Sequence, residues 1–295
     1  MRLKRLLIAV AIVFIVGWAV NANGKLGLTK PKEPALAVVS AVMMDVDTGK
    51  WLYRSNAAKP LPPASMSKMM TEVLVLDSVN SGNIAWNDTT AASTYASRVG
   101  GAKMGLTEGQ IVTVKELFEA MAVHSANDAS VALAELIAGT ETEFVKRMNA
   151  KAEVIGLSKA SRFANATGLS SSDLRDIKTA AAKGETMMTA EDVALLAKYL
   201  IETYPEVLQT TKKAEAGYAN VKLQTTNEML PGQRFGTRGN DGLKTGYTER
   251  AGYCFTGTTV SGGRRYITVV MGASTPEARF EETKKLLAYA EGSST

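Results

Sequence analysis

The stretch Lys59-Pro60-Leu61-Pro62-Pro63-Ala64-Ser65-Met66-Ser67-Lys68 decides how this 295-residue chain is interpreted. Its three prolines cannot continue a strand or a helix, so they deliver the chain stiffly to Ser65. Over residues 65–77 the apolar positions recur at helical spacing, which predicts a helix that begins at this serine. Ser65 and Lys68 then lie one turn apart on one helix face. A neutral lysine there can take the proton of the serine hydroxyl, which makes Ser65 a candidate nucleophile.

Two further motifs follow in order, Ser125-Ala126-Asn127 and Lys244-Thr245-Gly246. Each motif alone is a weak signal, because chance should give a chain of this size about one Ser-x-x-Lys. Ser-x-Asn also begins at Ser78 and Ser81, where turn chemistry at the end of the predicted helix explains it. Lys-Thr-Gly occurs once. The ordered set is the signature of serine enzymes that interact with penicillin.

The composition, with 45% apolar and 21% charged residues, is that of an ordinary globular protein. The net charge of +5 is misleading, because three basic residues stand directly ahead of an apolar run over residues 6–20. With the small residues of Val20-Asn21-Ala22, this pattern predicts a secretory signal over residues 1–22. That segment holds three of the 34 basic residues and none of the 29 acidic ones, so 31 basic and 29 acidic residues remain, a net charge of +2. No nucleic-acid partner is therefore expected.

The alternative for the same run is an uncleaved membrane anchor, although its 15 residues are short for a span of about 20. Either interpretation places the rest of the chain outside the cytoplasm, with membrane contact only through an uncleaved N-terminal segment. Cys254 is the only cysteine, so neither a lipoprotein signal nor an intrachain disulfide is expected. One cysteine and one histidine cannot form a metal-ligand cluster, and no cofactor is expected.

Periodicity and turn residues predict a mixture of strands and helices in one catalytic domain over residues 35–290, after a polar lead-in over 23–34 and before a tail over 291–295. Thr113-x-x-Glu116 is a capping box that opens a helix, and Ser125-Ala126-Asn127-Asp128 interrupts the apolar pattern between two helices. Thr189 resembles a cap for a helix that runs to about residue 203. Other expected strands are at 38–46, 51–53, 221–223, 253–259 and 265–271, and a further strand is expected to end at 242–244. Other expected helices are at 129–137, 142–155 and 280–290, with a turn at 261–264 and a surface loop with marginal helix at 170–186.

Longer segments surround the motifs: Pro63-Ala64-Ser65-Met66-Ser67-Lys68-Met69-Met70-Thr71, Phe163-Ala164-Asn165-Ala166-Thr167-Gly168-Leu169 and Asp241-Gly242-Leu243-Lys244-Thr245-Gly246-Tyr247-Thr248. They closely resemble the serine D-alanyl-D-alanine carboxypeptidases, the low-molecular-mass penicillin-binding proteins, in the Bacillus-type branch. Arg279 matches a family arginine that is associated with the substrate carboxylate. The similarity extends from about residue 35 to residue 289.

The resemblance implies an α/β (α+β) fold in which helices flank an antiparallel sheet, a helical lobe adjoins it, and the site lies between sheet and lobe. It implies that Ser65 is the nucleophile, that Lys68 is its base and that Ser125 relays a proton to the leaving amine. The backbone amides of Ser65 and Tyr247 would form the oxyanion hole. The residues implied to bind the substrate are Asn127, Lys244, Thr245, Gly246, Tyr247 and Arg279.

The implied reaction removes the terminal D-Ala from peptidoglycan stem pentapeptides through an acyl-enzyme, with β-lactam antibiotics as covalent inhibitors. It implies an extracytoplasmic protein, secreted or at the outer face of the cytoplasmic membrane, that acts in cell-wall synthesis. Two departures from the family pattern stand out. Gly101-Ala102-Lys103-Met104 occupies the place of a common Gly-Ser-x-Met, which would alter the loop beside the cleft. We also expect no C-terminal β-rich domain and no C-terminal amphipathic helix.

Four alternatives compete with this function. A Ser-His-Asp triad through His124 and Asp128 is disfavoured, because no Gly-x-Ser-x-Gly elbow is present. A class A β-lactamase would need a deacylating carboxylate in the loop before the third motif, and residues 165–169 contain none. The intact motif set argues against a non-catalytic penicillin-binding sensor. A DD-endopeptidase that cuts peptidoglycan crosslinks remains open.

Overall fold

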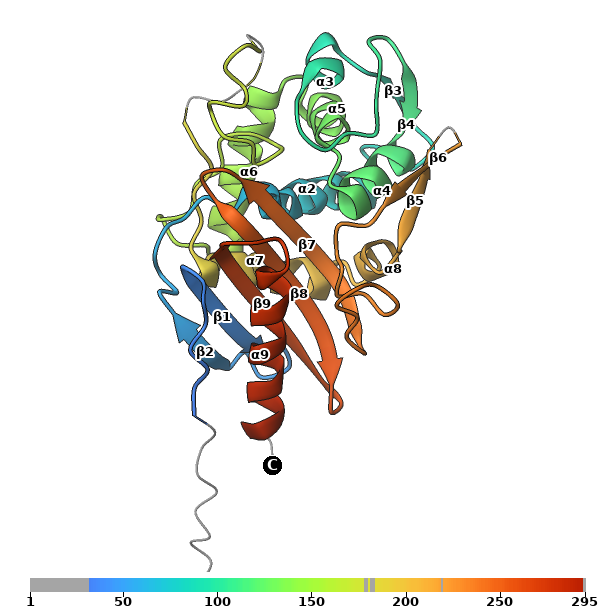
Figure 1. Ribbon diagram of the computed structural model, residues 1–295. Helices are drawn as coiled ribbons and strands as arrows, with labels where there is room; N and C mark the ends of the chain where they lie inside the picture. Colours follow the sequence, from blue (N-terminus) through green and yellow to red (C-terminus); the bar gives the residue numbers. More distant parts are fainter. Residues whose placement is uncertain (1–31, 178–179, 181–183, 219, 294–295) are drawn as a thin grey trace, which may run out of the picture.

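An antiparallel sheet with helices on both of its faces forms the body of the protein (Figure 1). The computed structural model describes residues 32–177, 180, 184–218 and 220–293. The signal or anchor predicted at residues 1–22 lies outside these residues, as does most of the predicted lead-in. Among the helices that are described, none is long and apolar enough to cross a membrane.

The sheet has the strand order β2-β1-β9-β8-β7, so the first strands of the chain pair with the last. Its strands are β1 (Ser40–Asp45), β2 (Trp51–Ser55), β7 (Asn240–Thr248), β8 (Gly252–Ser261) and β9 (Arg264–Ala273). All neighbouring strands are antiparallel. The predicted turn between β8 and β9 is confirmed, with Gly262 and Gly263 both at positive φ, as a two-residue hairpin turn requires. This order leaves β7 at an edge of the sheet.

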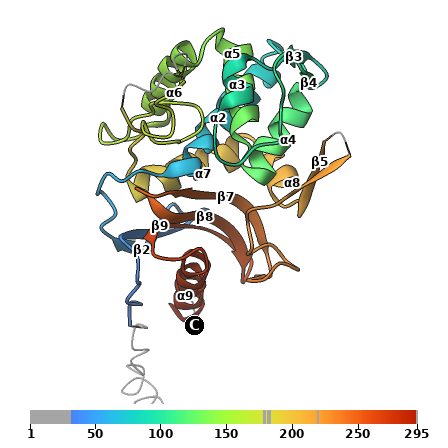
Figure 2. The ribbon, with the colours of Figure 1, turned by 45° about the horizontal axis from the view of Figure 1, so that its top comes forward.

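Two separate hydrophobic cores cover the two faces of the sheet (Figure 2). All six residues of β1 are buried, and successive side chains point to opposite faces. Ala41 and Met43 therefore pack in the core beneath α9 (Ala278–Ser293), whereas Val42 and Met44 pack in the core of the helical lobe. A continuous apolar run in β1 is typical of a strand that is covered on both faces.

The helical lobe lies across the sheet from α9 (Figure 2). Its helices are α2 (Lys68–Asn80), α3 (Thr94–Arg98), α4 (Val114–His124), α5 (Asn127–Ala138), α6 (Glu141–Ile155), α7 (Ala190–Thr203) and α8 (Val207–Thr211). Two small antiparallel sheets border it, one of β3 (Thr89–Ala91) and β4 (Ile111–Thr113) and one of β5 (Glu215–Tyr218) and β6 (Val221–Gln224). The first nine residues of α2 are all buried, which makes α2 the central helix of the lobe.

The helix starts predicted from capping residues are confirmed. The Thr113 side chain accepts from the backbone of Glu116 and the Glu116 side chain returns to Thr113, which completes the capping box of α4. Thr189 accepts from the backbone of Asp192 at 3.0 Å and caps α7. The next helix after α4 starts earlier than expected, at Asn127, because the left-handed conformation of Ser125 ends α4 abruptly.

The prediction that a strand ends at residues 242–244 is wrong, because β7 continues through the third motif to Thr248. Its pairing with β8 places Thr245 opposite Phe255 and Gly246 opposite Cys254. Predicted strand and helix cores elsewhere are confirmed with small shifts at their ends. The described part of residues 170–186 holds turns and irregular chain but no helix. The sequence does not predict the short elements β3, α3, β4, α8 and β5.

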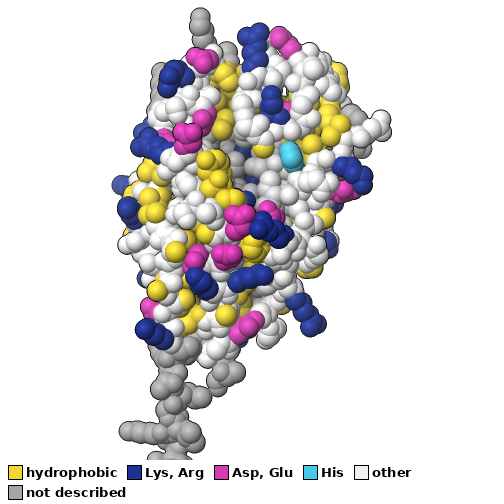
Figure 3. Space-filling view, viewed as in Figure 1, with side chains coloured by type: hydrophobic (Ala, Val, Ile, Leu, Met, Phe, Trp, Pro, Cys, Tyr) yellow, Lys and Arg dark blue, Asp and Glu magenta, His cyan; other side chains and the backbone are white. Residues whose placement is uncertain are grey.

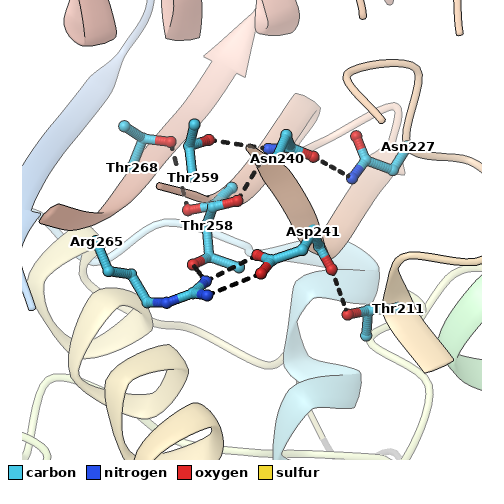
Figure 4. A network of polar contacts seen from close by, with 9 residues as sticks. Thr211, Asn227, Asn240, Asp241, Thr258, Thr259, Arg265 and Thr268 are labelled. Carbon is cyan, nitrogen blue, oxygen red and sulfur yellow. Dashed lines mark hydrogen bonds and ion pairs between the residues drawn. The ribbon is translucent and has the colours of Figure 1, made fainter. Parts of the chain in front are cut away.

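A polar network ties the start of β7 to β8 and β9, the next two strands of the sheet (Figure 4). Both carboxylate oxygens of Asp241 accept from the Arg265 guanidinium at 2.8 Å, and Arg265 also donates to Thr258 Oγ1 at 2.6 Å. Asn240 donates to the carbonyl of Thr258 at 3.1 Å and accepts from Asn227 at 3.0 Å. Because two parallel N–H···O bonds fix distance and orientation together, this network sets the position at which β7 enters the third motif.

Arg265→Met is expected to lower the free energy of unfolding by about 1–3 kcal/mol, because it leaves the Asp241 carboxylate without its ion partner. Both side chains of this pair are only 23% exposed. Arg234→Met is the matched control, since Arg234 is 63% exposed and its partner Glu277, at 3.0 Å, is 36% exposed. Its loss should stay below about 1 kcal/mol. Urea unfolding of both variants measures the difference, and equal losses would contradict the role given to the network.

Candidate active site

Ser65 lies in a short 3-10 turn, η1 (Ala64–Ser67), so α2 begins three residues later than the predicted helix. Ala64 has a positive φ of 49°, which a residue with a side chain adopts only where its surroundings hold it. Two glycines press on this turn. A Cβ at Gly246 of β7 would lie 2.6 Å from the Pro63 carbonyl oxygen, and one at Gly168 would lie 2.1 Å from the Ala64 carbonyl oxygen. The turn is therefore clamped at positions that only glycine can occupy.

Lys68 is the first residue of α2, and it is 0% exposed. Its Nζ donates to Ser65 Oγ at 2.8 Å, to Asn127 Oδ1 at 2.6 Å and to the Thr167 carbonyl at 2.7 Å. An ammonium group has three N–H donors, so these three acceptors satisfy it fully. Ser125 is not among the three partners.

The chemistry of these three partners fixes what a neutral Lys68 must do. A neutral amine has two N–H donors and one lone pair, so one of the three contacts has to reverse. The Thr167 carbonyl oxygen can only accept a hydrogen bond. Asn127 Oδ1 can likewise only accept, and the amide is fixed in this orientation because its Nδ2 donates to the Gly100 carbonyl at 2.7 Å. Ser65 Oγ is the one partner that can donate. The 2.8 Å contact is thus suited to proton transfer from Ser65 to Lys68.

Burial and charge both favour the neutral form of Lys68. Burial lowers the pKa of Lys68 well below its ordinary value of 10.5, and the nearby Lys244 lowers it further. Glu72 and Asp128 act in the opposite direction and raise the pKa of Lys68, by less. Lys244 is 1% exposed, and burial lowers its pKa as well. Two buried amines thus share one part of the protein interior, where both cannot be charged at low cost.

The second motif is joined to the loop of residues 100–106. The Asn127 backbone donates to the Ala102 carbonyl at 2.7 Å. The Asp128 carboxylate accepts from three successive backbone amides of the same loop at 2.9–3.0 Å. The loop and the start of α5 are therefore held as one unit, and Ala102, which stands where the family pattern has serine, lines the cleft.

The other end of the cleft is built by the third motif and the start of α9. Thr245 Oγ1 donates to Thr226 Oγ1 at 2.6 Å. The guanidinium carbon of Arg279 lies 5.7 Å from the ring centre of Tyr253, which stacks on Tyr247 at 4.3 Å. Hydroxyl groups beside a guanidinium can bind a carboxylate.

The cleft has a volume of about 320 Å³. Figure 3 shows a hollow on this face of the molecule, next to the cyan histidine side chain. Seven of the nine predicted site residues line it, and the exceptions, Lys68 and Lys244, are buried within the protein. The lining residues are Ser65, Gly101, Ala102, Ser125, Asn127, Leu169, Thr226, Thr245, Gly246, Tyr247, Tyr253 and Arg279. Within the part of the chain that is described, the buried Nε of Arg279 has no hydrogen-bond partner. An arginine side chain keeps its positive charge even when it is largely buried, so Arg279 offers a cation in the cleft to an anionic ligand.

The Ser-His-Asp alternative finds no geometric support. His124 Nδ1 bonds the Gln224 carbonyl at 2.8 Å, and a carbonyl can only accept, so this nitrogen carries the proton. The Asp128 carboxylate accepts from backbone amides and not from His124. His124 is the last residue of α4, where its ring ties that helix to β6.

The loop that would have to carry a β-lactamase carboxylate serves another purpose. Asn165 Oδ1 accepts from the backbone amides of Thr167 and Gly168 at 3.1 and 2.7 Å, which folds the loop so that the Thr167 carbonyl reaches Lys68. Glu141 supports the loop by accepting from the Ala166 amide at 2.9 Å. None of the described residues that line the cleft is Asp or Glu. In the described chain, no three His, Cys, Asp or Glu residues gather as metal ligands.

Three members of the site are missed by the sequence analysis. The carbonyl of Thr167 has no side-chain signal at all. Thr226 stands in a polar turn after β6 and meets Thr245 only in the folded protein. Glu72 carries a usable signal, because it follows Lys68 by four residues and therefore shares its helix face.

A serine in the turn before a buried helix and a buried lysine at the start of that helix, beside a cleft between an antiparallel sheet and a helical lobe, define the class of penicillin-interacting serine enzymes. The model of the D-alanyl-D-alanine carboxypeptidase family matches residues 28–275, and the chain belongs to this family. The resemblance stated from the sequence and the fold class it implied are thereby confirmed.

The relatives agree with this assignment. D-alanyl-D-alanine carboxypeptidase DacF of Bacillus subtilis is 37% identical over 298 residues, covering 98% of this chain and 71% of that protein. The crystal structure of PBP3, a peptidoglycan synthesis regulatory factor from Streptococcus pneumoniae, matches with a TM-score of 0.83 and 37% identity over 88% of this chain and 74% of that one. Penicillin-binding protein D2 from Listeria monocytogenes in its ampicillin-bound form matches with a TM-score of 0.77 and 36% identity over 88% of this chain and 99% of that one.

Gly246→Ala is expected to reduce the reactivity of Ser65 about a hundredfold, because its Cβ pushes β7 away from the turn that holds Ser65. Gly217→Ala in β5 is the matched control, since a Cβ there meets nothing within 4 Å. The rate of acylation by labelled penicillin measures the effect, and near-ultraviolet circular dichroism checks the fold. A folded Gly246→Ala variant that reacts as fast as Gly217→Ala would contradict the clamp.

Proposed function

We propose that this protein is a serine-type D-alanyl-D-alanine carboxypeptidase that removes the terminal D-Ala of peptidoglycan stem pentapeptides through an acyl-enzyme on Ser65. The observation that carries the proposal is the 2.8 Å contact between Ser65 Oγ and Lys68 Nζ. The other two hydrogen-bond partners of Lys68 Nζ can only accept, so Ser65 Oγ is the one partner that can give it a proton. Membership of the family supports the reaction class. The cationic end of the cleft supports a substrate with a free C-terminal carboxylate.

In the acylation step, Ser65 Oγ attacks the carbonyl carbon of the penultimate D-Ala, and its proton passes to neutral Lys68. The backbone amides of Ser65 and Tyr247 stabilise the tetrahedral oxyanion. The C–N bond to the terminal D-Ala then breaks, and the leaving amine takes the proton from Lys68 by way of the Ser125 hydroxyl. Lys68 is neutral again when the free D-Ala leaves.

In the deacylation step, water attacks the ester carbon while Lys68 accepts its proton and returns it to Ser65 Oγ. The ester C–O bond breaks, and the stem tetrapeptide leaves as a carboxylic acid that releases its remaining proton to the solvent. Asn127 orients Lys68 and the substrate amide in both steps. In the acylation step, Thr245 and Arg279 bind the terminal carboxylate, and the buried Lys244 attracts it through its charge. Because no carboxylate residue lines the described cleft, the same lysine serves as base in both steps.

This substrate lies in the cell wall, so the protein acts outside the cytoplasm. β-lactam antibiotics would acylate the same serine, as expected for a relative of penicillin-binding proteins. Cleavage of the predicted signal at residue 22 stays a prediction, as does retention as a membrane anchor.

Lys68→Arg is expected to stay folded and to lose at least about a hundredfold in acylation by penicillin, because a guanidinium cannot accept the serine proton. Ser65→Ala should lose the adduct entirely. His124→Ala is the control and should keep near-normal acylation. Intact-mass spectrometry with peptide mapping measures the adduct and its position, and an adduct outside residues 63–68 would exclude Ser65 as the nucleophile.

Arg279→Ala is expected to lower kcat/KM for a stem pentapeptide about a hundredfold, because a charge-assisted contact with the terminal carboxylate is lost. The same variant should cut a C-terminally amidated peptide no worse than the wild type does. Arg234→Ala is the control, since Arg234 is exposed and does not line the cleft. D-alanine release measures both, and a wild-type enzyme that cuts only crosslinked dimers would assign the endopeptidase function instead.

A further inference from the structure

A buried carboxylate without a partner lies directly behind the proposed catalytic lysine. Glu72 follows Lys68 by one helical turn on α2 and is 1% exposed. Within the described residues, neither of its carboxylate oxygens has a hydrogen-bond partner. Such a group is costly to bury, and the great majority of buried polar groups are paired. The proposed reaction steps do not use Glu72, so its presence calls for another explanation.

Burial raises the pKa of Glu72 to about 7, and the positive charges of Lys244 on β7 and of Lys68 on its own helix act against burial by favouring the ionised carboxylate. Asp128 of α5 also acts on Lys68, and Arg279 of α9 also acts on Lys244. Asp128 already accepts several backbone amides, whereas Glu72 accepts none.

Glu72 acts on the lysines through space. The hydrogen bonds of Lys68 go to Ser65, Asn127 and Thr167. Lys244 donates to the carbonyl of Thr245 at 3.2 Å. Neither amine therefore forms a hydrogen bond with the Glu72 carboxylate. Lys68 Nζ thus stays free to form its hydrogen bond with Ser65 Oγ.

Counting charges shows what Glu72 does to the two lysines. With both lysines protonated and Glu72 ionised, the buried cluster has a net positive charge, and with one lysine proton removed its net charge is zero. The electroneutral state costs least in a medium of low dielectric constant.

The neighbours of each lysine decide which one loses the proton. The largest charge effect on Lys68 is repulsion from Lys244, and the largest charge effect on Lys244 is attraction to Glu72. We propose that Glu72 is a positioning residue that keeps one lysine of the pair protonated and the other neutral, so that Lys68 is the neutral base and Lys244 the cation. This inference rests on the proposed function of Ser65 and Lys68.

The inference predicts a shift of the whole pH profile. The second-order rate constant of acylation reports groups of the free enzyme, so it rises where Lys68 loses its proton and falls where Lys244 loses its own. The negative charge of Glu72 raises the pKa of both lysines. Removing this charge lowers both pKa values, and both limbs of the profile then move to lower pH.

Glu72→Gln removes the charge and keeps the shape, and both limbs are expected to move down by about one pH unit. Glu72→Asp keeps the charge and should leave the limbs near their wild-type positions. If Glu72→Gln does not fold, Glu72→Leu repeats the test, because an apolar side chain suits a buried position without hydrogen bonds. Glu282→Gln is the matched control, since Glu282 is 4% exposed with an unpartnered oxygen but lies on α9 beyond the sheet.

Stopped-flow acylation by penicillin across the pH range, with each variant's fold checked, gives the profiles. Limbs that stay in place in a folded, uncharged variant overturn the proposal and leave Glu72 a structural role, even if the rate falls at every pH. Limbs that move in opposite directions overturn it as well. Wild-type acylation at Ser65 in the same assay separates these outcomes from failure of the proposed function.

Discussion

A primary amine that is buried away from solvent, Lys68, is the constraint on which the rest of this structure depends. Three acceptors must reach it, and they come from the turn at Ser65, from the start of α5 at Asn127 and from the loop at Thr167. These segments are far apart in the chain, so the helical lobe has to close around the first turn of α2. The cost of burying an unsatisfied amine makes this convergence obligatory.

The sheet contributes to the same constraint from its edge. β7 approaches the Ser65 turn so closely that Gly246 leaves no room for a side chain, and Gly168 approaches the turn as well. An edge strand can make this approach because its outer side is not paired with another strand. The ion pair of Asp241 and Arg265 fixes the position of the start of β7. A contact outside the cleft thereby helps to set where Gly246 meets the Ser65 turn inside it.

Local signals were enough to predict most of the fold, because capping residues and apolar periods act within a few residues. Thr113 and Thr189 mark helix starts correctly for this reason. The extension of β7 past residue 244 could not be predicted, since it depends on pairing with β8 and on contact with η1. Most of the site residues that the motifs predicted do lie in one cleft of the folded protein. The Thr167 carbonyl and the Thr226 hydroxyl escape prediction because only tertiary contacts give them a role.

A lysine base asks more of its surroundings than a histidine base, whose ordinary pKa already lies near neutrality. Burial and the nearby Lys244 lower the pKa of Lys68, and a positive charge on Lys244 would also suit an anionic substrate. The two tasks conflict, because a carboxylate arriving near Lys244 would raise the pKa of Lys68 and favour its inactive, protonated form. Arg279 supplies a further positive charge, which lowers the pKa of Lys244 and would offset part of the negative charge of an incoming carboxylate. An arginine suits that position better than a third lysine, because it retains its charge where lysines lose theirs.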